Sequence, residues 1–411
     1  MTNAADVVVL DNGLTVLVET MPEVQSAAYS LLVPAGSAFD PAGQNGAASV
    51  LSDWLARGAG DRDNREFSCE LDRWGIQHGQ SVTASHQLFS GGCLAGNLSQ
   101  ALGLMGDMVE RPHLPDEEFE ACVAGAQHEL QALDDEPRQK VMLELVRRCY
   151  PAPWGQPPEG TLADLEHLTP ASLRQHFQQT IQPDRAILGL AGRVTVDEIL
   201  PAVRAAFDGW KRGSAAMPVR GSRGVLLDHL TAESTQTHIG VAYPTVPYRD
   251  PDYFAAWAAV SVLSGGMSSR LFTEIREKRG LCYSVYATLS TLRDEGSVLC
   301  YAGSTNDRAQ ETLDVLVQEL RRLGDGIAEA ELHRAKALAK TSLVMQQESS
   351  SARAGSLARD WYHLGRVTTP DEVQQKIERL TTASVVEFVR SHPPEPCTVV
   401  TIGPSPLENH S

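Results

Sequence analysis

The sequence predicts an α+β protein made of two related domains, each a largely antiparallel sheet with helices packed on one face. In both halves, strand-like segments come first, helix-like segments follow and a late strand ends the series. The polar stretch KRGSAAMPVRGSRG, which lacks apolar periodicity, divides the chain near its middle. The 411 residues, 42% hydrophobic and 21% charged, suffice for two cores. We therefore expect an N-terminal domain over residues 1–212, a linker over 213–224 and a C-terminal domain over 225–411.

The first half is expected to begin with a β-hairpin. Asn12-Gly13 separates two apolar runs, and this dipeptide provides the positive φ angles of a tight turn. Asn45 and Asn64 are predicted to cap the next two helices through their side chains. Further strands are expected at 26–33, 76–90 and 186–191, and further helices at 98–110, 116–133, 138–149, 170–180 and 196–207.

The second half repeats this order of elements without repeating the residues. Strands are expected at 225–230, 237–243, 282–289, 297–304 and 397–402, and helices at 251–263, 268–279, 309–323, 329–347 and 352–363. This repetition is the reason for predicting two related domains.

Charge and cysteine usage exclude several classes of protein. A net charge of −17 without any basic tract argues against a nucleic-acid partner. The seven cysteines include no C-x-x-C pair, which favours a reducing compartment. No signal peptide and no apolar run long enough to span a membrane is visible, so we expect a cytoplasmic protein without a membrane partner.

Two stretches carry a family resemblance. DNGLTVLVETMPEVQSAAYSLLVPAGSAFDPAGQNGAASVLSDWLARG resembles the N-terminus of the insulinase/pitrilysin family of zinc metallopeptidases, the inverzincins. LSGGMSSRLFTEIREKRGLCYSVYA resembles the substrate-binding segment of the family's C-terminal domain. The likeness runs in order along nearly the whole chain, and it implies the metallopeptidase-like fold of that family.

The catalytic motif of the family is degenerate here. Catalytic members carry H-x-x-E-H on a helix, where two imidazoles one turn apart hold zinc and the Glu acts as general base. The resemblance places Ser49 and Asp53 at the two histidines, Ser52 at the catalytic Glu, and Glu129 at the distal zinc ligand. We therefore expect no catalytic residue and no metal in this chain, and interpret Ser49, Ser52 and Asp53 as a polar patch that lines a cavity. A hard cation held by Asp53 and Glu129 would need several more oxygens.

The substrate-binding motif is intact in IREKRGLCY. The resemblance implies that Arg276 and Tyr283 grip backbone carbonyls of an extended substrate, and both side chains offer suitable donors. Gly280 is predicted to end the intervening helix. The alternative is structural: Arg276 complements the helix C-terminus and Tyr283 packs in the sheet.

The resemblance implies a non-catalytic, substrate-binding subunit of a heterodimeric peptidase. Its partner would be a zinc-bearing catalytic subunit of the same family, and its ligands would be unfolded or short peptides. Zinc is expected only in the partner, and the chain alone is expected to be inactive. Two alternatives stay open: a structural or assembly protein like the core subunits of respiratory complexes, and an active metallopeptidase with atypical ligands.

Overall fold

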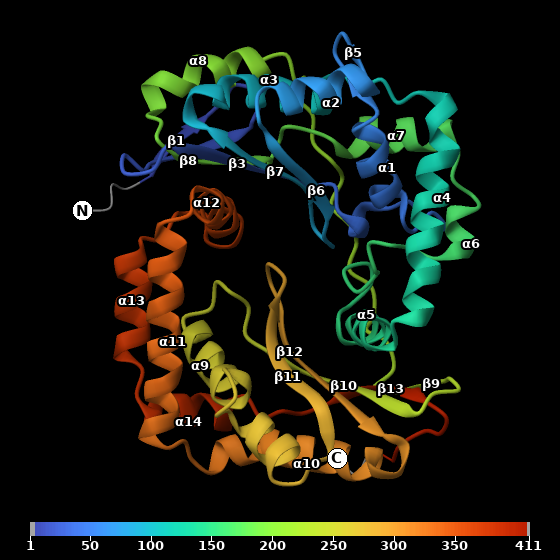
Figure 1. Cartoon of the computed structure of the whole chain (residues 1–411), viewed down its shortest axis with the longest axis vertical. Helices are drawn as coiled ribbons and strands as arrows, with labels where there is room; N and C mark the ends of the chain where they lie inside the picture. The colour runs from blue at the N-terminus through green and yellow to red at the C-terminus, as the bar shows by residue number, and fades with distance from the viewer. Residues whose placement is uncertain (1–4, 409–411) are drawn as a thin grey trace. The chain divides into compact units, whose positions relative to one another are not determined.

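The computed structural model describes residues 5–408, which form two compact units, each around its own sheet (Figure 1). Unit 1 contains the chain up to Ala132, then Gln156–Arg220 and Met345–Thr369. Unit 2 contains Leu133–Gly155, Gly221–Val344 and the chain from Pro370 onward. The expected division into 1–212, 213–224 and 225–411 treats each domain as continuous. The compact units instead each include one helical segment from the other half of the sequence.

The sheet of unit 1 is six-stranded and mostly antiparallel. Its spatial order is β1 (Asp6–Val9), β2 (Thr15–Thr20), β8 (Ile187–Gly192), β3 (Ser26–Val33), β7 (Gln87–Leu94) and β6 (Gln77–Val82). Only β2 and β8 pair in parallel. The predicted hairpin is confirmed, since β1 and β2 pair antiparallel. Of the two turn residues expected to have positive φ, only Gly13 does, at +100°, while the Asn12 side chain donates to the carbonyl oxygen of Phe207 at 2.7 Å. Strand β6 ends the sheet on one side and leaves an open edge there.

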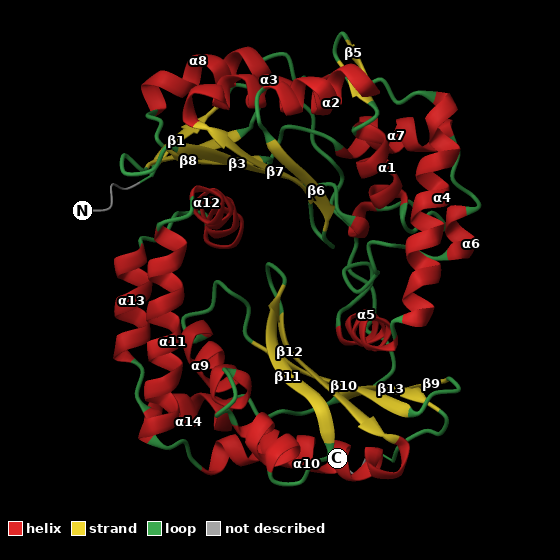
Figure 2. Ribbon diagram, viewed as in Figure 1, coloured by secondary structure: helices red, strands yellow, loops and turns green. Residues whose placement is uncertain are grey.

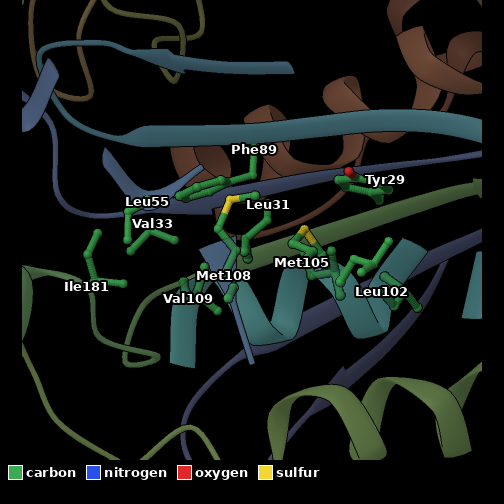
Figure 3. Packing of buried hydrophobic residues seen from close by; sticks show 14 of the residues in the cluster. Tyr29, Leu31, Val33, Leu55, Phe89, Leu102, Met105, Met108, Val109 and Ile181 are labelled. Carbon is green, nitrogen blue, oxygen red and sulfur yellow. The ribbon is translucent and has the colours of Figure 1, made fainter. Parts of the chain in front are cut away.

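Helices cover both faces of this sheet. The main helices of unit 1 are α1 (Ala47–Leu55), α2 (Asn64–Arg73), α3 (Leu98–Glu110), α4 (Asp116–Ala132), α7 (Pro170–Thr180) and α8 (Val196–Phe207). Alternate strand residues such as Leu31 and Phe89 pack with Leu102 and Met105 of α3 in the larger core (Figure 3). Short elements complete the unit: β4 (Gly58–Ala59), β5 (Arg62–Asp63) and α6 (Leu162–Leu165).

The opposite face of the unit 1 sheet carries α12 (Ser350–Leu364), a helix from the C-terminal half of the chain. Leu17 and Ile187 of the sheet pack against Leu357 of this helix. The helix approaches closely because Gly189 has no side chain. A Cβ at that position would lie 2.3 Å from the carbonyl oxygen of Ala354.

We expect Gly189→Ala to destabilise unit 1 by about 1–3 kcal/mol, because a methyl group there forces the α12 backbone away from the sheet. Gly92→Ala is the matched control: it lies on β7, where an added Cβ would meet its nearest atom at 3.5 Å. That variant should change the free energy of unfolding by less than about 1 kcal/mol. Urea unfolding followed by circular dichroism measures both, and equal midpoints for the two variants would contradict the packing argument.

The sheet of unit 2 is five-stranded. Its order is β11 (Cys282–Thr291), β12 (Gly296–Thr305), β10 (Gln236–Thr245), β13 (Thr398–Gly403) and β9 (Leu227–Thr231). All neighbours are antiparallel except β13 and β9. Strand β11 therefore forms one edge. The α+β class with two largely antiparallel sheets is confirmed.

Each sheet was expected to carry helices on one face, but in unit 2, as in unit 1, helices cover both faces (Figure 2). Val241 and Cys300 face the larger core, which includes residues of α9 (Tyr253–Ser264), α10 (Ala309–Arg322) and α14 (Thr382–Ser391). Ala242 and Leu299 face Leu145 of α5 (Pro137–Cys149), the helix that comes from the N-terminal half. Two further helices, α11 (Glu329–Gln347) and α13 (Pro370–Arg379), complete the set.

Some local predictions were wrong. Asn45 does not cap α1, because its amide donates to Asp164 at 2.6 Å, and Gly46 occupies the N-cap with φ +98°. Asp63, not Asn64, caps α2 in a reciprocal arrangement with Glu66. No prediction was made for α13 and α14. Within residues 5–408 no helix combines the length and apolarity that a membrane span requires.

Candidate functional site

Helix α1 has one apolar face and one polar face. Val50, Leu51 and Trp54 are buried in the core of unit 1. The positions of the degenerate motif, which are three and four residues apart, lie on the opposite face and line one pocket, as the sequence predicts.

The N-terminus of α1 is fixed by Asp40. Its Oδ2 accepts a hydrogen bond from the amide of Gly46 and its Oδ1 one from the amide of Ala48, both at 2.8 Å. Burial raises the pKa of Asp40 to about 7, although these hydrogen bonds act in the opposite direction. His176 Nε2 of α7 lies 3.7 Å from Asp40 Oδ1, and burial lowers the pKa of this imidazole to about 4. The buried Asp40 carboxyl thus fixes the start of the helix, whereas the neighbouring His176 imidazole makes no hydrogen bond to the described residues.

The pocket belongs entirely to unit 1 and has a volume of about 630 Å³. It is bordered by α1, by the edge strand β6, by α4 and by the loop before α6. Its lining residues are Ser49, Ser52, Asp53, Ala56, His78, Gly79, Gln80, Ser81, Val82, Cys122, Gly125, Ala126, Pro158, Glu129 and Glu159. The structure therefore brings all four degenerate-motif positions to one cavity.

The three motif residues of α1 already have protein partners. The Ser49 hydroxyl donates to the carbonyl oxygen of Pro158 at 2.6 Å. The Ser52 hydroxyl donates to Gln80 Oε1 at 3.2 Å. Both oxygens of Asp53 accept from Arg57 Nη2, at 3.0 and 2.8 Å, across one turn of the helix.

The remaining acidic groups of the pocket are unpaired. Glu129 is exposed, and its carboxylate makes no hydrogen bond or ion pair with any part of the chain that the structure describes. Within the same residues, Glu159 Oε2 is buried without a hydrogen-bond partner. Burial, reinforced by the neighbouring Asp53, raises the pKa of the Cys122 thiol to about 12. Cys122 is therefore a protonated, unreactive thiol.

These side chains do not fit a zinc site. Catalytic zinc takes three protein ligands, usually including imidazoles, and leaves a fourth position for water. Here Arg57 occupies both oxygens of Asp53, and a serine hydroxyl is not among the usual zinc ligands. Across residues 5–408, no group of three or more His, Cys, Asp or Glu side chains is arranged to hold a metal ion.

The intact motif lies in unit 2 and is built by a distinct backbone. The segment η4 (Phe272–Glu277) winds as a π-helix, and the amide of Lys278 donates to the carbonyl oxygen of Thr273. Gly280 ends it with φ +57°, as predicted, and its amide donates to the carbonyl oxygen of Arg276. Strand β11 begins two residues later, at Cys282.

Arg276 and Tyr283 lie together. The guanidinium carbon of Arg276 is 4.8 Å from the ring centroid of Tyr283 and 4.8 Å from that of Phe272. A β-bulge between Cys282 and Ser284 leaves Tyr283 out of the strand pairing, and the residue is 80% exposed. The predicted structural alternative places Tyr283 within the packed sheet, and this exposure contradicts that part of it.

The donors of this pair are available. Arg276 has two aromatic contacts but no hydrogen bond or ion pair to the residues that the structure describes. Its guanidinium therefore contacts two aromatic rings while its N–H donors stay unused by the described residues. Arg276 and Tyr283 were predicted from the sequence but Phe272 was not, although Arg276 stands at i+4 from Phe272. Likewise Arg57 and Gln80, the partners of the degenerate motif, were not predicted, although Arg57 stands at i+4 from Asp53.

Comparisons with known proteins point to one peptidase family. The model described as insulinase (peptidase family M16) matches residues 15–156, and the model described as peptidase M16 inactive domain matches residues 167–338. A protein of Mycobacterium leprae named uncharacterized zinc protease is 29% identical over 388 residues, which cover 92% of this chain and 86% of the relative. The uncharacterized zinc protease YmxG of Bacillus subtilis is 25% identical over 398 residues, 96% of this chain and 97% of the relative.

Solved structures share the fold at low identity. The peptidase M16 inactive domain from Pseudomonas fluorescens has a TM-score of 0.90 at 20% identity, with 99% of both chains covered. A protease from Helicobacter pylori also has a TM-score of 0.90 at 20% identity, with 98% of this chain and 100% of that chain covered. Two models of one family match in order along the sequence and the fold is shared, so the chain belongs to the insulinase family, peptidase family M16, and lacks its H-x-x-E-H motif.

Proposed function

We propose that this chain is a non-catalytic, substrate-binding subunit that pairs with a zinc-bearing catalytic subunit of the same family to degrade peptides. The observation that carries the proposal is the Arg276–Tyr283 pair. A guanidinium that contacts two rings and has unused donors, beside a tyrosine that is 80% exposed, is suited to binding a ligand. A role in packing alone would bury these groups.

The division of labour is chemically consistent. Peptide hydrolysis by zinc needs a metal-activated water and a substrate held in the correct alignment. The pocket beside α1 lacks the ligands and the general base for the first requirement, since serine hydroxyls and an Arg-paired carboxylate occupy those positions. The Arg276–Tyr283 pair meets the second requirement, because both side chains donate to carbonyl oxygens.

The proposed complex would act in the cytoplasm as a heterodimer on unfolded or short peptides. All seven cysteines are free thiols, six of them buried, which suits a reducing compartment. This chain would hold no cofactor, and the zinc would belong to its partner.

Reconstitution tests the proposal. A tagged copy of this chain, expressed in its native host, should co-purify with a family member that carries H-x-x-E-H. Neither protein alone should cleave a fluorogenic peptide at more than about 1% of the rate of the mixture, because each lacks one requirement of catalysis. A chelator should abolish the activity of the mixture. Chelator-sensitive cleavage by this chain alone, or full activity of the zinc-bearing protein without it, would contradict the proposal.

A further inference from the structure

A second arginine lies over tyrosines in unit 2. Arg138 stands near the start of α5, and its guanidinium carbon is 5.0 Å from the ring centroid of Tyr286 and 5.3 Å from that of Tyr301. The two rings are stacked, with centroids 5.3 Å apart and an interplanar angle of 30°. Tyr286 and Tyr301 are direct partners on the neighbouring strands β11 and β12.

The tyrosine platform is firmly supported. Tyr301 is 3% exposed, and its hydroxyl lies 2.9 Å from Nδ1 of the buried His238 on β10. Gly303 leaves room for this hydroxyl, because a Cβ there would lie 2.6 Å from it. Burial raises the pKa of Tyr301 to about 12, so this side chain is a neutral phenol. The platform thus has one fixed arrangement.

The guanidinium of Arg138 has no partner beyond the rings. Arg138 is exposed, and it makes no hydrogen bond or ion pair with the residues in 5–408. Arg147 and Arg148 of the same helix both pair with Glu144. In a chain with 52 acidic and 35 basic residues, an exposed arginine with all its donors unused is notable. The two rings contact the guanidinium from one side and use none of its N–H donors, which are left for a ligand.

The arrangement repeats that of Arg276 and Tyr283. Tyr283, the bulge residue, and Tyr286 lie three residues apart on β11, the edge strand of the sheet, and this separation spans at most roughly 10 Å of strand. Each of these tyrosines carries an arginine over its ring, at 4.8 and 5.0 Å. An extended peptide covers the same distance in about three residues.

We propose that Arg138, held on Tyr286 and Tyr301, binds a carboxylate of the peptide that Arg276 and Tyr283 hold by its backbone. A carboxylate is the expected ligand because the planar fork of a guanidinium pairs with it through two parallel hydrogen bonds, which a single carbonyl oxygen does not allow. The carboxylate would lie about three residues from the carbonyl that Arg276 binds. This inference rests on the proposed function, since it assigns a side-chain preference to the same substrate.

Peptide binding to the full-length chain tests the inference. The probes are fluorescein-labelled, C-terminally amidated ten-residue peptides of one neutral sequence, in which a single Glu replaces Gln at successive positions. At one position Glu should increase the affinity about tenfold, the size expected for a charge-assisted hydrogen bond. A peptide with no Glu and a free C-terminus distinguishes a terminal carboxylate from a side-chain carboxylate.

Variants identify the residue responsible. Arg138→Met keeps an apolar stem on the rings and removes the donors, so it should abolish the preference for Glu, and the Glu and all-Gln peptides should then bind equally. Arg147→Met, on the same helix but away from the tyrosines, should keep the preference. Thermal unfolding checks that both variants fold, and Arg138→Lys provides a second, charge-retaining variant that should recover part of the preference.

The possible failures are distinguishable. A preference for Glu that survives in Arg138→Met would overturn the assignment and leave Arg138 as an anchor of α5. The same conclusion follows if peptides bind through Arg276, as judged by Arg276→Ala, without any preference for a carboxylate. If no peptide binds the unmodified chain or its complex with the zinc-bearing subunit, the proposed function itself fails and this inference fails with it.

Discussion

Replacing Arg276 by alanine is expected to lower kcat/KM of the assembled peptidase about 100-fold while the subunits stay associated. The physical reason is the loss of a fixed donor set next to the substrate backbone. The guanidinium contacts the rings of Phe272 and Tyr283, which hold it in position before a carbonyl arrives. A preorganised donor of this kind contributes most where water is excluded.

Tyr283→Phe is expected to have a smaller effect in the same direction. The ring remains, so Arg276 keeps its stacking partner, and only the hydroxyl donor is lost. Loss of a single hydrogen bond to a carbonyl lowers the rate by roughly tenfold. In the double variant the losses should be less than additive, because the two residues hold one substrate segment as a unit.

The measurements are kcat/KM with a fluorogenic peptide and gel filtration of the mixed subunits. Lys278→Ala is the matched control, since this residue lies in the same segment but is exposed and paired with Glu274 at 2.6 Å. Its effect should stay within about twofold. If the double variant retains full activity in an intact complex, the chain has a structural or assembly role instead.

The element order of the fold was predictable from the sequence, because it depends on local patterns. Helices α3 and α8 and strand β3 have the predicted bounds, each marked by strong periodicity or a clear turn. The placement of α5 and α12 was not predictable. Amphipathic periodicity shows that a helix buries one face but does not show which sheet it covers. That choice depends on close contacts such as the one between Gly189 and Ala354, which are distant in sequence.

The residue that caps helix α1 was also not predictable from local sequence. Asn45 has a favourable residue type and position for a cap, but its amide is engaged by Asp164. Asp40 accepts the hydrogen bond from the Gly46 amide instead, although it lies six residues before Gly46, farther than capping rules consider. Local propensity predicts that a helix begins here, and tertiary hydrogen bonds decide which side chain satisfies its free amides.

The residues of the candidate site were predictable from the sequence, but the side chains that contact them were not. The i, i+3, i+4 spacing on α1 predicts that Ser49, Ser52 and Asp53 share a face, and they do. The hydrogen bond from the Ser52 hydroxyl to Gln80 of β6 depends on how the edge of the sheet packs against the helix. The contact of Arg276 with Phe272 follows the i, i+4 spacing of a helix face, but its place beside Tyr283 of β11 depends on tertiary packing.

The purified chain is expected to hold no zinc, and a triple variant with Ser49→His, Ser52→Glu and Asp53→His is expected to hold about one zinc ion per chain. The reason is geometric. Positions 49 and 53 face one pocket, one helical turn apart, and Glu129 of α4 lines the same pocket without a competing ion pair within the described residues. Two imidazoles and this carboxylate make the three protein ligands that a catalytic zinc site requires. Elemental analysis after dialysis measures the zinc content of both proteins.

Glu129 and Arg57 provide the decisive comparisons. Adding Glu129→Gln to the triple variant removes one of three ligands, so zinc affinity should fall at least tenfold. Arg57 has the opposite effect. Once Asp53 is replaced, the Arg57 guanidinium loses both hydrogen bonds to that carboxylate and lies beside a divalent cation, and among residues 5–408 only Glu118, at 3.4 Å, then offsets its charge. Adding Arg57→Met should therefore tighten zinc binding.

Zinc retained stoichiometrically by the unmodified chain would refute the assignment of a degenerate site. If the Arg57→Met form of the triple variant fails to bind zinc, the competing charge of Arg57 is not the cause. The failure would then show that α1 and α4 do not present these positions as ligands.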